Sequence, residues 1–271
     1  MPAEHYSEQL IRSSGFADAR FPTGYDTHRP SPPQALLDLL CLEAQVERPG
    51  LVVDFGSGTG LSTRAWADRA GDVVGIEPSE QMRLRAEDAT ESSNVRYVQA
   101  FADETGLPGA QADIVTCSQS FHWMEPDPTL AEVARILRPG GVFAAYDYDW
   151  PPVVHWEVED AFEELMVRVG DSRTDRLGYV SIAEKEGHLE RMRASGHFRF
   201  TREALVHSRE TGNADRIVGL AFSLGPLNVL LEGGMTEDEL GLTQLREVAA
   251  KALGEPETNW FLCYRARLGI K

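Results

Sequence analysis

A run of closely spaced glycines follows the first strongly apolar stretch of the chain. Residues 53–60 read VDFGSGTG, with glycines at positions 56, 58 and 60. So much backbone freedom at one strand end indicates that a bulky ligand must approach the backbone closely. The acidic residue Glu77 follows 21 positions after Gly56, where a carboxylate can accept hydrogen bonds from both hydroxyls of a ribose. The loop and the acid together predict a ribose-containing ligand.

The spacing of these glycines disfavours two common nucleotide sites. No Gly-Lys-Ser/Thr sequence follows the loop, as a nucleotide phosphate loop would require. The dinucleotide pattern G-x-G-x-x-G, started at Gly56, would need its last glycine where this chain has Leu61. The loop reads G-x-G-x-G instead, preceded by Asp54. A glycine-rich turn without any ligand is the alternative, which Glu77 disfavours.

These residues lie where predicted strands end. Apolar runs predict strands at 51–55, 72–77, 94–100, 112–118 and 141–148. Helices are predicted between them, over 61–69, from the N-cap Ser79 to about Ala89, and from Asp127 or Thr129 to Leu137. Alternation of strand and helix predicts a parallel sheet with helices on both faces. The glycine loop then lies at the carboxyl edge of that sheet, where open α/β folds bind ligands.

The second half of the chain departs from this rhythm. Helical patterns occur over 157–169, 182–194, 213–232 and 236–253, and strands are predicted at 197–208 and 258–270. Ahead of the core, residues 16–33 read as an extended lead-in and 33–44 as a helix. We therefore predict an α/β fold with a doubly wound, mostly parallel seven-stranded sheet and helical cap insertions.

Four segments of the core resemble the class I S-adenosylmethionine-dependent methyltransferases. They read VVDFGSGTGLST, VVGIEPSEQM, GLPGAQADIVTCSQSFHWME and EVARILRPGGVFAAYDYDW, and they cover about 51–150 in the family's order and spacing. The match is strongest to the branch of trans-aconitate methyltransferase-like small-molecule enzymes, which the lead-in GYDTHRPSPP and the ending FLCYRARLGIK also resemble. The resemblance implies a Rossmann-like methyltransferase fold, with S-adenosyl-L-methionine as the cofactor.

The resemblance also implies a division of the chain and a role for each loop residue. Residues 1–50 would form a lead-in and a cofactor-covering helix, 51–150 the cofactor-binding core, and 151–271 the cap insertions with the last two strands of the same domain. The residues that would pack against the methionine and ribose portions of the cofactor are Gly56, Ser57, Gly58 and Gly60. Asp54 would organise the loop and help to hold the cofactor's amino group.

Further cofactor contacts follow from the same resemblance. Glu77 would bind the ribose hydroxyls. The residues beside the adenine would be Pro78, Met82, Asp103 and, through its backbone, Ala102. Ser118 and Gln119 would line the reacting end, and Tyr25 and Arg29 would fold over the cofactor from the lead-in.

The candidate catalytic residues are His122, Trp123 and Tyr146. They belong to an aromatic group at the ends of the fourth and fifth strands, which also contains Phe121, Tyr148 and Trp150. Aromatic faces can stabilise a sulfonium and shape an apolar pocket, although about half of such residues are expected to be ordinary core. His122 could remove a proton from a nucleophile or bind an anionic substrate. A hydrogen-bonded structural histidine is an equally good interpretation.

Metal chemistry is not expected. Asp147 and Asp149 could form only a weak site with His122. Four arginines of the first insertion are candidates for clamping a carboxylate, although a solvated helix surface explains them as well: Arg168, Arg173, Arg176 and Arg191.

The composition disfavours several classes of binding partner. The 271 residues carry 43 acidic and 26 basic side chains, for a net charge of −17, which disfavours nucleic acid and anionic membranes. The three cysteines show neither metal-ligand nor disulfide spacing. No run of about 18 apolar residues predicts a membrane span. We therefore expect a cytoplasmic monomer or homodimer that acts on a small-molecule substrate.

Two other functions compete with methyl transfer to a small-molecule acceptor in a closed, aromatic-lined pocket. In the first, the cofactor's own amino group attacks its γ-carbon, which yields azetidine-2-carboxylate and methylthioadenosine. In the second, the chain is a non-catalytic binding protein that retains the methyltransferase fold. The intact glycine loop and Glu77 argue against the second.

Overall fold

The computed structural model describes residues 25–177 and 184–271; for Tyr25 and 173–177 it describes the backbone alone. One seven-stranded sheet runs through the molecule in the order β3-β2-β1-β4-β5-β7-β6. Its strands are β1 (Leu51–Phe55), β2 (Asp72–Ile76), β3 (Val95–Val98), β4 (Ala112–Ser118), β5 (Leu137–Tyr148), β6 (Phe200–Gly212) and β7 (Thr258–Ile270). The first five strands pair in parallel, and β7 runs antiparallel to both β5 and β6. The predicted mostly parallel, seven-stranded α/β sheet is confirmed.

The strand order reverses beside β1 because β2 and β4 lie on its two sides. In an open α/β sheet such a reversal leaves a crevice beyond the carboxyl ends of the strands. The glycine loop leaves β1 at this point, so the topology alone places it at the mouth of a binding site.

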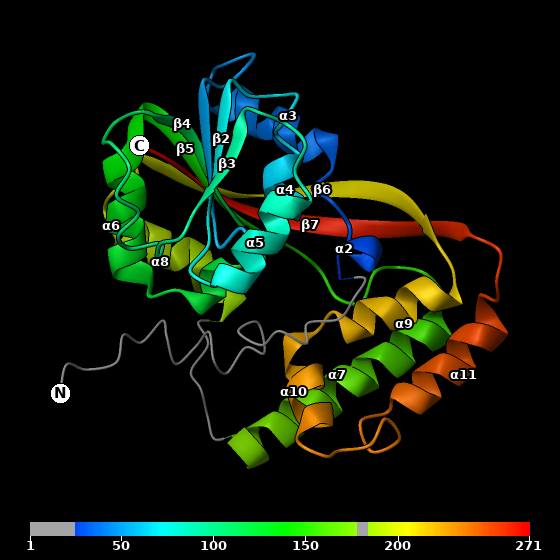
Figure 1. Cartoon of the computed structure of the whole chain (residues 1–271). Coiled ribbons are helices and arrows are strands. Elements are labelled where there is room, and N and C mark those ends of the chain that lie inside the picture. The colour runs from blue at the N-terminus through cyan, green and yellow to red at the C-terminus, as the bar shows by residue number, and fades with distance from the viewer. Residues whose placement is uncertain (1–24, 178–183) are drawn as a thin grey trace.

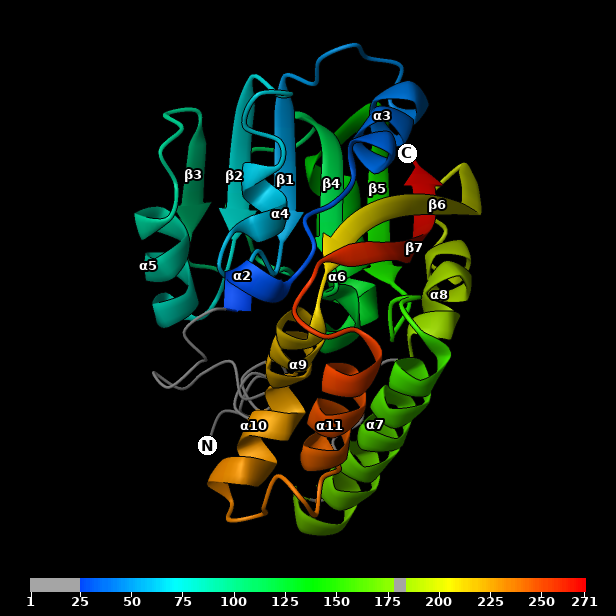
Figure 2. The same cartoon turned by 90° about the vertical axis from the view of Figure 1, so that its right-hand side faces the viewer.

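Helices cover both faces of the sheet (Figures 1 and 2). One face packs against α3 (Gln34–Glu43), α4 (Leu61–Arg64) and α5 (Glu80–Asp88), and the other against α6 (Pro126–Ile136) and α8 (His188–Ala194). Ser79 caps α5, because its hydroxyl accepts a hydrogen bond from the Met82 N–H at 3.4 Å, as predicted. The short helix α2 (Tyr25–His28) precedes α3, and the 3₁₀ turns η1 (Phe121–Trp123) and η2 (Lys185–Gly187) directly precede α6 and α8.

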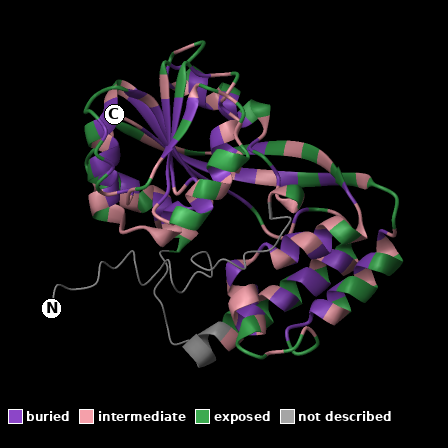
Figure 3. Cartoon of the chain, in the orientation of Figure 1, coloured by how far each residue is buried: buried purple, intermediate pink, exposed green. Residues whose placement is uncertain are grey.

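The remaining four helices form a bundle at the carboxyl edge of the sheet, which we call the cap. They are α7 (Trp156–Leu177), α9 (Ala214–Phe222), α10 (Gly225–Glu232) and α11 (Leu242–Ala252). The cap has an apolar core of its own, which includes Phe162, Leu227 and Leu245, all with no exposed surface. Figure 3 shows buried positions along the strands and, separately, along the inner faces of these helices. The Trp260 side chain, from β7, completes the cap core.

Several predicted element ends are wrong. The region 213–232 was expected as one helix, but it breaks at Ser223 and Leu224 because Pro226 at the start of α10 cannot continue a helix. The helix predicted over 61–69 ends at Arg64, and the one predicted over 236–253 begins only at Leu242. None of the described helices is by itself long and apolar enough to cross a bilayer; α9 and α10 together, bent by 74°, meet the length and composition test.

Candidate active site

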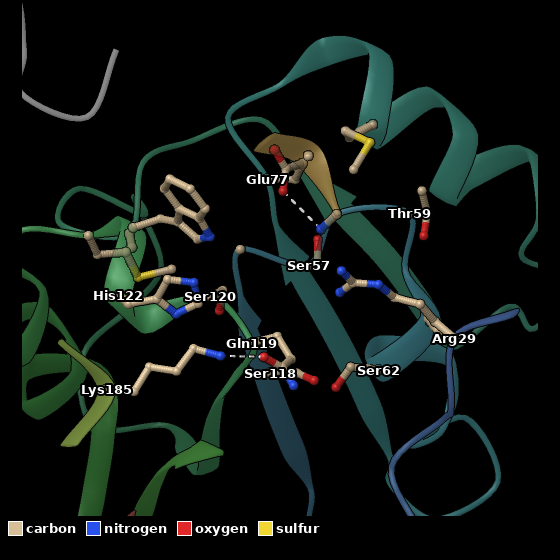
Figure 4. Close-up of a pocket in the computed structure, with 18 of the residues that line it drawn as sticks. Arg29, Ser57, Thr59, Ser62, Glu77, Ser118, Gln119, Ser120, His122 and Lys185 are labelled. Atoms are coloured by element: carbon tan, nitrogen blue, oxygen red, sulfur yellow. Dashed lines mark hydrogen bonds between the residues drawn. The ribbon is translucent and has the colours of Figure 1, made fainter. Parts of the chain in front are cut away.

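A cavity of about 370 Å³ opens at the carboxyl edge of the sheet, between the core and the cap. Such a volume suits a small organic ligand. Its walls come from the lead-in, the glycine loop, the ends of β2 and β4, η1, η2 and the cap (Figure 4). Segments that are far apart in the sequence, from Arg29 to Pro226, therefore contribute residues to one site.

The glycine loop is shaped by backbone conformations that other residues rarely adopt. Gly56 and Gly58 have φ values of 66° and 55°. A Cβ atom on Gly56 would lie 2.7 Å from the Cβ of Ser120, so this position has no room for a side chain. The N–H groups of Gly56 and Ser57 both donate to the Ile76 carbonyl, at 2.8 and 3.0 Å. The loop is thus fixed to β2 while its upper surface borders the cavity.

Glu77 is held in a position to meet a ligand's hydroxyl groups. Its carboxylate accepts hydrogen bonds from the Gly58 N–H at 2.8 Å and from the Ser79 N–H at 2.9 Å. Burial raises the pKa of this carboxyl to about 7, although the two backbone donors act in the opposite direction. The carboxylate therefore carries its full charge only above neutral pH, and added donors would stabilise that charge.

Asp54 lies beneath the loop and not on the cavity wall. Its two carboxylate oxygens accept hydrogen bonds from the hydroxyls of Thr63 at 2.8 Å and Thr116 at 2.7 Å. Complete burial raises its pKa to about 6. These bonds tie β1, β4 and α4 together under the loop.

The opposite end of the cavity is rich in aromatic side chains. His122 and Trp123 of η1 line it together with Tyr148 and Trp150 from the end of β5. Met166 of α7 and Leu224, Gly225 and Pro226 at the start of α10 form its cap side. Arg29 enters from the lead-in, where its guanidinium donates to the Ser223 hydroxyl and carbonyl, each at 3.0 Å. It also lies 5.7 Å from the centre of the Trp150 ring.

Comparison with known proteins identifies the family. The family model described as "Methyltransferase domain" matches residues 53–145. An uncharacterized methyltransferase of Mycobacterium tuberculosis is 32% identical over 182 residues, which are 67% of this chain and 70% of the relative. The chain belongs to the class I S-adenosylmethionine-dependent methyltransferases. A probable S-adenosylmethionine-dependent methyltransferase of Saccharomyces cerevisiae is 30% identical over 135 residues, 48% of this chain and 46% of that protein.

Solved structures support the same fold. A putative type II methyltransferase from Anaeromyxobacter dehalogenans superposes with a TM-score of 0.64 at 24% identity, over 89% of this chain and 97% of that one. A phosphoethanolamine N-methyltransferase of Haemonchus contortus, solved with S-adenosyl-L-methionine, gives a TM-score of 0.52 at 18% identity, over 100% of this chain and 61% of that one. Because the chain belongs to the S-adenosylmethionine-dependent methyltransferases, its cofactor is S-adenosyl-L-methionine. The assignment to the trans-aconitate branch stays a prediction.

The residues present fit that cofactor. Ser57 offers a buried hydroxyl that has no hydrogen-bond partner among the described residues and borders the cavity. Glu77 lies on the same wall as an acceptor for ribose hydroxyls. Most of the predicted cofactor residues line the cavity: Arg29, Gly56, Ser57, Gly58, Glu77, Pro78, Met82, Ala102, Asp103, Ser118 and Gln119.

Two of the predicted cofactor residues that the structure describes in full, Asp54 and Gly60, do not line the cavity. Asp54 supports the loop from below, and Gly60, with φ of 83°, begins α4, where a Cβ atom would clash with the Tyr97 hydroxyl. The side chain of Tyr25 lies outside the described residues. Its helix α2 is nevertheless attached to the loop region, because Asp26 accepts hydrogen bonds from the Thr59 hydroxyl and from Arg64.

Of the three candidate catalytic residues, His122 and Trp123 line the cavity and Tyr146 does not. The Tyr146 side chain is fully buried in the sheet core, and its hydroxyl lies 2.6 Å from the hydroxyl of Ser62, which does line the cavity. Burial raises the pKa of Tyr146 well above its usual range. In this structure Tyr146 therefore lies behind Ser62 and not on the cavity wall, and its catalytic role stays a prediction.

Lys185 is a charged cavity residue that the sequence analysis does not single out. Its ammonium lies 2.7 Å from the Gln119 Oε1 and 2.8 Å from the Asp147 Oδ1. The arginines considered for such a position lie elsewhere. Arg168 pairs with Glu164 on an exposed helix face, and Arg191 donates to the Glu184 carbonyl. Arg173 and Arg176 have side chains outside the described residues. Only the scarcity of lysine, three in the chain, could have drawn attention to Lys185.

The two acidic residues at the end of β5, Asp147 and Asp149, form ion pairs with basic side chains. Asp147 pairs with Lys185 and with Arg267, whose guanidinium lies 3.1 Å away, and its Oδ1 is 4.0 Å from His122 Nδ1. Asp149 pairs with Arg265 at 3.3 Å. Across residues 25–172 and 184–271, no cluster of three or more His, Cys, Asp or Glu side chains is arranged to hold a metal ion. The chemistry proposed below uses none.

Proposed function

We propose that this methyltransferase transfers the methyl group of S-adenosyl-L-methionine to a small molecule held in the described cavity. The observation that carries the proposal is that one cavity joins the glycine loop and Glu77 to residues of the cap, including Met166 and Leu224. A cap above the reacting end favours an acceptor small enough to be enclosed. The net charge of −17 independently disfavours nucleic acid.

At the cofactor end, the chain's own groups bind and orient. Glu77 would accept hydrogen bonds from the ribose hydroxyls, and Pro78, Met82 and Ala102 would enclose the adenine. Asp103 would meet the adenine edge, as the family resemblance implies. When bound, the cofactor supplies a sulfonium with an electrophilic methyl group, and alignment of the acceptor with that group is what the protein adds.

At the reacting end, aromatic walls and one histidine remain for the acceptor. Trp123, Tyr148 and Trp150 would exclude water and present electron-rich faces toward positive charge. His122 would take the proton from an acceptor oxygen or acidic carbon as the new bond forms. Its place on the cavity wall, within reach of a bound molecule, supports this role over that of a core histidine.

The test is product analysis with isotope-labelled cofactor. The purified full chain is incubated with methyl-labelled S-adenosyl-L-methionine and, in separate reactions, with small metabolites, mixed proteins or transfer RNA. Label transfer confined to small metabolites supports the proposal. Transfer to macromolecules contradicts it. Release of methylthioadenosine without an acceptor would instead reveal the cyclising reaction, and cofactor binding without turnover in any reaction would indicate a binding protein.

A further inference from the structure

The reacting end of the cavity contains an ammonium group that binding of the methyl donor does not explain. Lys185 stands at the start of η2, and its side chain is 29% exposed. We infer that Lys185 binds a carboxylate of the methyl acceptor, and that the acceptor is therefore a small carboxylic acid with an apolar body. The inference rests on the proposed function and deepens it.

Lys185 stands at the cavity end of a chain of ion pairs that continues through Asp147 and Arg267 to Glu203. Its acidic partner, Asp147, also accepts a hydrogen bond from the Arg267 Nη1 at 3.1 Å, and both of these side chains are almost fully buried. Asp147 thus shares one negative charge between two cations. The next acid, Glu203, is bound on the far side of Arg267, to its Nε. The acids that line the cavity, Glu77 and Asp103, belong to the cofactor end.

The ammonium also keeps hydrogen-bonding capacity for a ligand. An ammonium group has three N–H donors. Among the described residues, Gln119 and Asp147 are the partners found for Lys185. Since Lys185 lines the cavity, a third donor is available to a bound molecule.

Gln119 holds the ammonium in place through a strained backbone. It is one of three described non-glycine residues with positive φ, at 55°, a conformation that persists only where surrounding contacts enforce it. Its N–H donates to the Tyr146 carbonyl at 2.9 Å, and its side-chain amide donates to the Tyr148 carbonyl at 3.3 Å. The amide oxygen is thereby directed at Lys185, so the ammonium is ordered before any ligand arrives.

A second cation, Arg29, also lines the cavity and would meet the cofactor's own carboxylate. Figure 4 shows Arg29 and Lys185 entering the cavity from opposite sides, with Arg29 nearer the Ser57 and Ser62 side and Lys185 beside Gln119 and His122. Arg29 would then be occupied by the cofactor, which leaves Lys185 as the cavity cation beside the proposed base. We therefore assign the acceptor carboxylate to Lys185, which lies next to the proposed base His122.

A carboxylate fits Lys185 better than a phosphate. A phosphate monoester carries about −1.5 to −2 charges and three acceptor oxygens, whereas the wall offers one ammonium that already pairs with Asp147. Besides the polar Gln119 and His122, the cavity wall includes the aromatic and apolar side chains of Trp123, Trp150 and Met166. They suit a hydrocarbon or aromatic body attached to a single carboxylate.

The test measures binding of matched probes to the full chain saturated with S-adenosylhomocysteine. The probes are benzoate, trans-cinnamate and hexanoate, each paired with its primary amide, together with phenyl phosphate. By calorimetry, we expect at least one acid to bind about 10- to 100-fold more tightly than its amide, because the amide loses a charge-assisted hydrogen bond. Lys185→Gln should abolish this preference, and Lys185→Arg should retain it. Lys251→Gln, at an exposed position of α11, is the matched control.

A chemical readout is independent of catalysis. Acetylation of the three lysines, quantified by mass spectrometry, should be slowed at Lys185 by the bound acid and unchanged at Lys251. Acid preference that survives in Lys185→Gln, equal binding of acids and amides, binding of no acid, or a preference for phenyl phosphate would each overturn the inference. Failure of the wild-type chain to bind S-adenosylhomocysteine would instead break the proposed function. Circular dichroism verifies that each variant is folded.

Discussion

The two ends of the cavity differ in the parts of the chain that form them. The cofactor end consists of the glycine-loop backbone and of residues that follow β2 and β3, including Glu77 and Asp103. The acceptor end consists of side chains from η1, η2 and the cap, such as His122, Lys185 and Leu224. A site made by backbone conformation requires glycines at fixed spacing, whereas a site made by side chains can change one residue at a time. The donor is therefore recognised by a motif, and the acceptor by an arrangement that only the folded chain reveals.

If the two ends of the cavity act separately, removing the proposed base should slow the chemical step and leave cofactor affinity unchanged. His122→Ala is expected to lower kcat about 100-fold or more, since a positioned base contributes that much to proton transfer. Its affinity for S-adenosyl-L-methionine should stay near that of the wild type. Steady-state kinetics with an identified acceptor and calorimetry with the cofactor provide the two measurements. An equal loss in both would make His122 a cofactor-binding residue.

The reciprocal change is Glu77→Ala at the cofactor end. Two ribose hydrogen bonds of about 1 kcal/mol each would be lost, so cofactor affinity should fall about 30-fold, and more if the bonds are charge-assisted. Calorimetry checks this, with Glu87→Ala on the outer face of α5 as a control for general destabilisation. Unchanged cofactor affinity in the Glu77 variant would remove Glu77 from the site.

The two ends should also differ in their response to pH. The pKa of Glu77 is raised to about 7 in the free protein, and ribose hydroxyls bind its charged form. Cofactor affinity should be constant above pH 7 and fall by up to about tenfold for each pH unit below it. The contribution of Glu77 to folding has the opposite sign. Because its folded pKa lies above its unfolded value, the free chain gains stability as pH falls from about 7 toward 4.5.

Thermal unfolding with and without S-adenosylhomocysteine between pH 5 and 8 separates the two effects. The stabilisation by the ligand should shrink toward acid pH, and Glu77→Gln should flatten that dependence. A ligand-induced shift that stays constant across this range in the wild type would contradict the assigned pKa.

Substitutions away from both ends of the cavity should have the smallest effect on cofactor affinity and turnover. Arg168→Ala removes an exposed pair with Glu164 at 3.4 Å, and such pairs contribute little. Neither cofactor affinity nor turnover should change measurably, and the same holds for treatment with a metal chelator. Loss of activity on chelation, restored by one divalent ion, would bring Asp147 and His122 back as metal ligands.

Much of the fold could be predicted because the core strands are buried on both faces. β1, β4 and β7 match their predicted ranges to the residue, since each is a run of strand-forming residues with clear ends. The ends of α4 and the break before α10 depend on local turns and a proline, which periodicity does not resolve.

Some residues of the site could likewise be predicted from the sequence, and others could not. Glu77 could be found from its spacing to the glycine loop. Tyr146 does not reach the cavity wall because it stands two residues before the end of β5, roughly 6.6 Å below the sheet edge, where Ser62 covers it. Lys185 could not be found because the path of the chain through the preceding insertion, and not any repeat in the sequence, brings it to Gln119.

The paired strands β6 and β7 connect the cap to the sheet and determine how the cap can move. The two strands pair over thirteen residues each, whereas β5 pairs with β7 only from Val142 to Tyr148. A two-stranded ribbon therefore continues past the sheet and ends at Trp260, packed against Gly212 within the cap core. The cap is mounted on a stiff arm in addition to its connecting loops. Motions that admit and release molecules should accordingly be small bending movements of this arm, slow to start and shared by all four cap helices, and hydrogen exchange along the ribbon would record them.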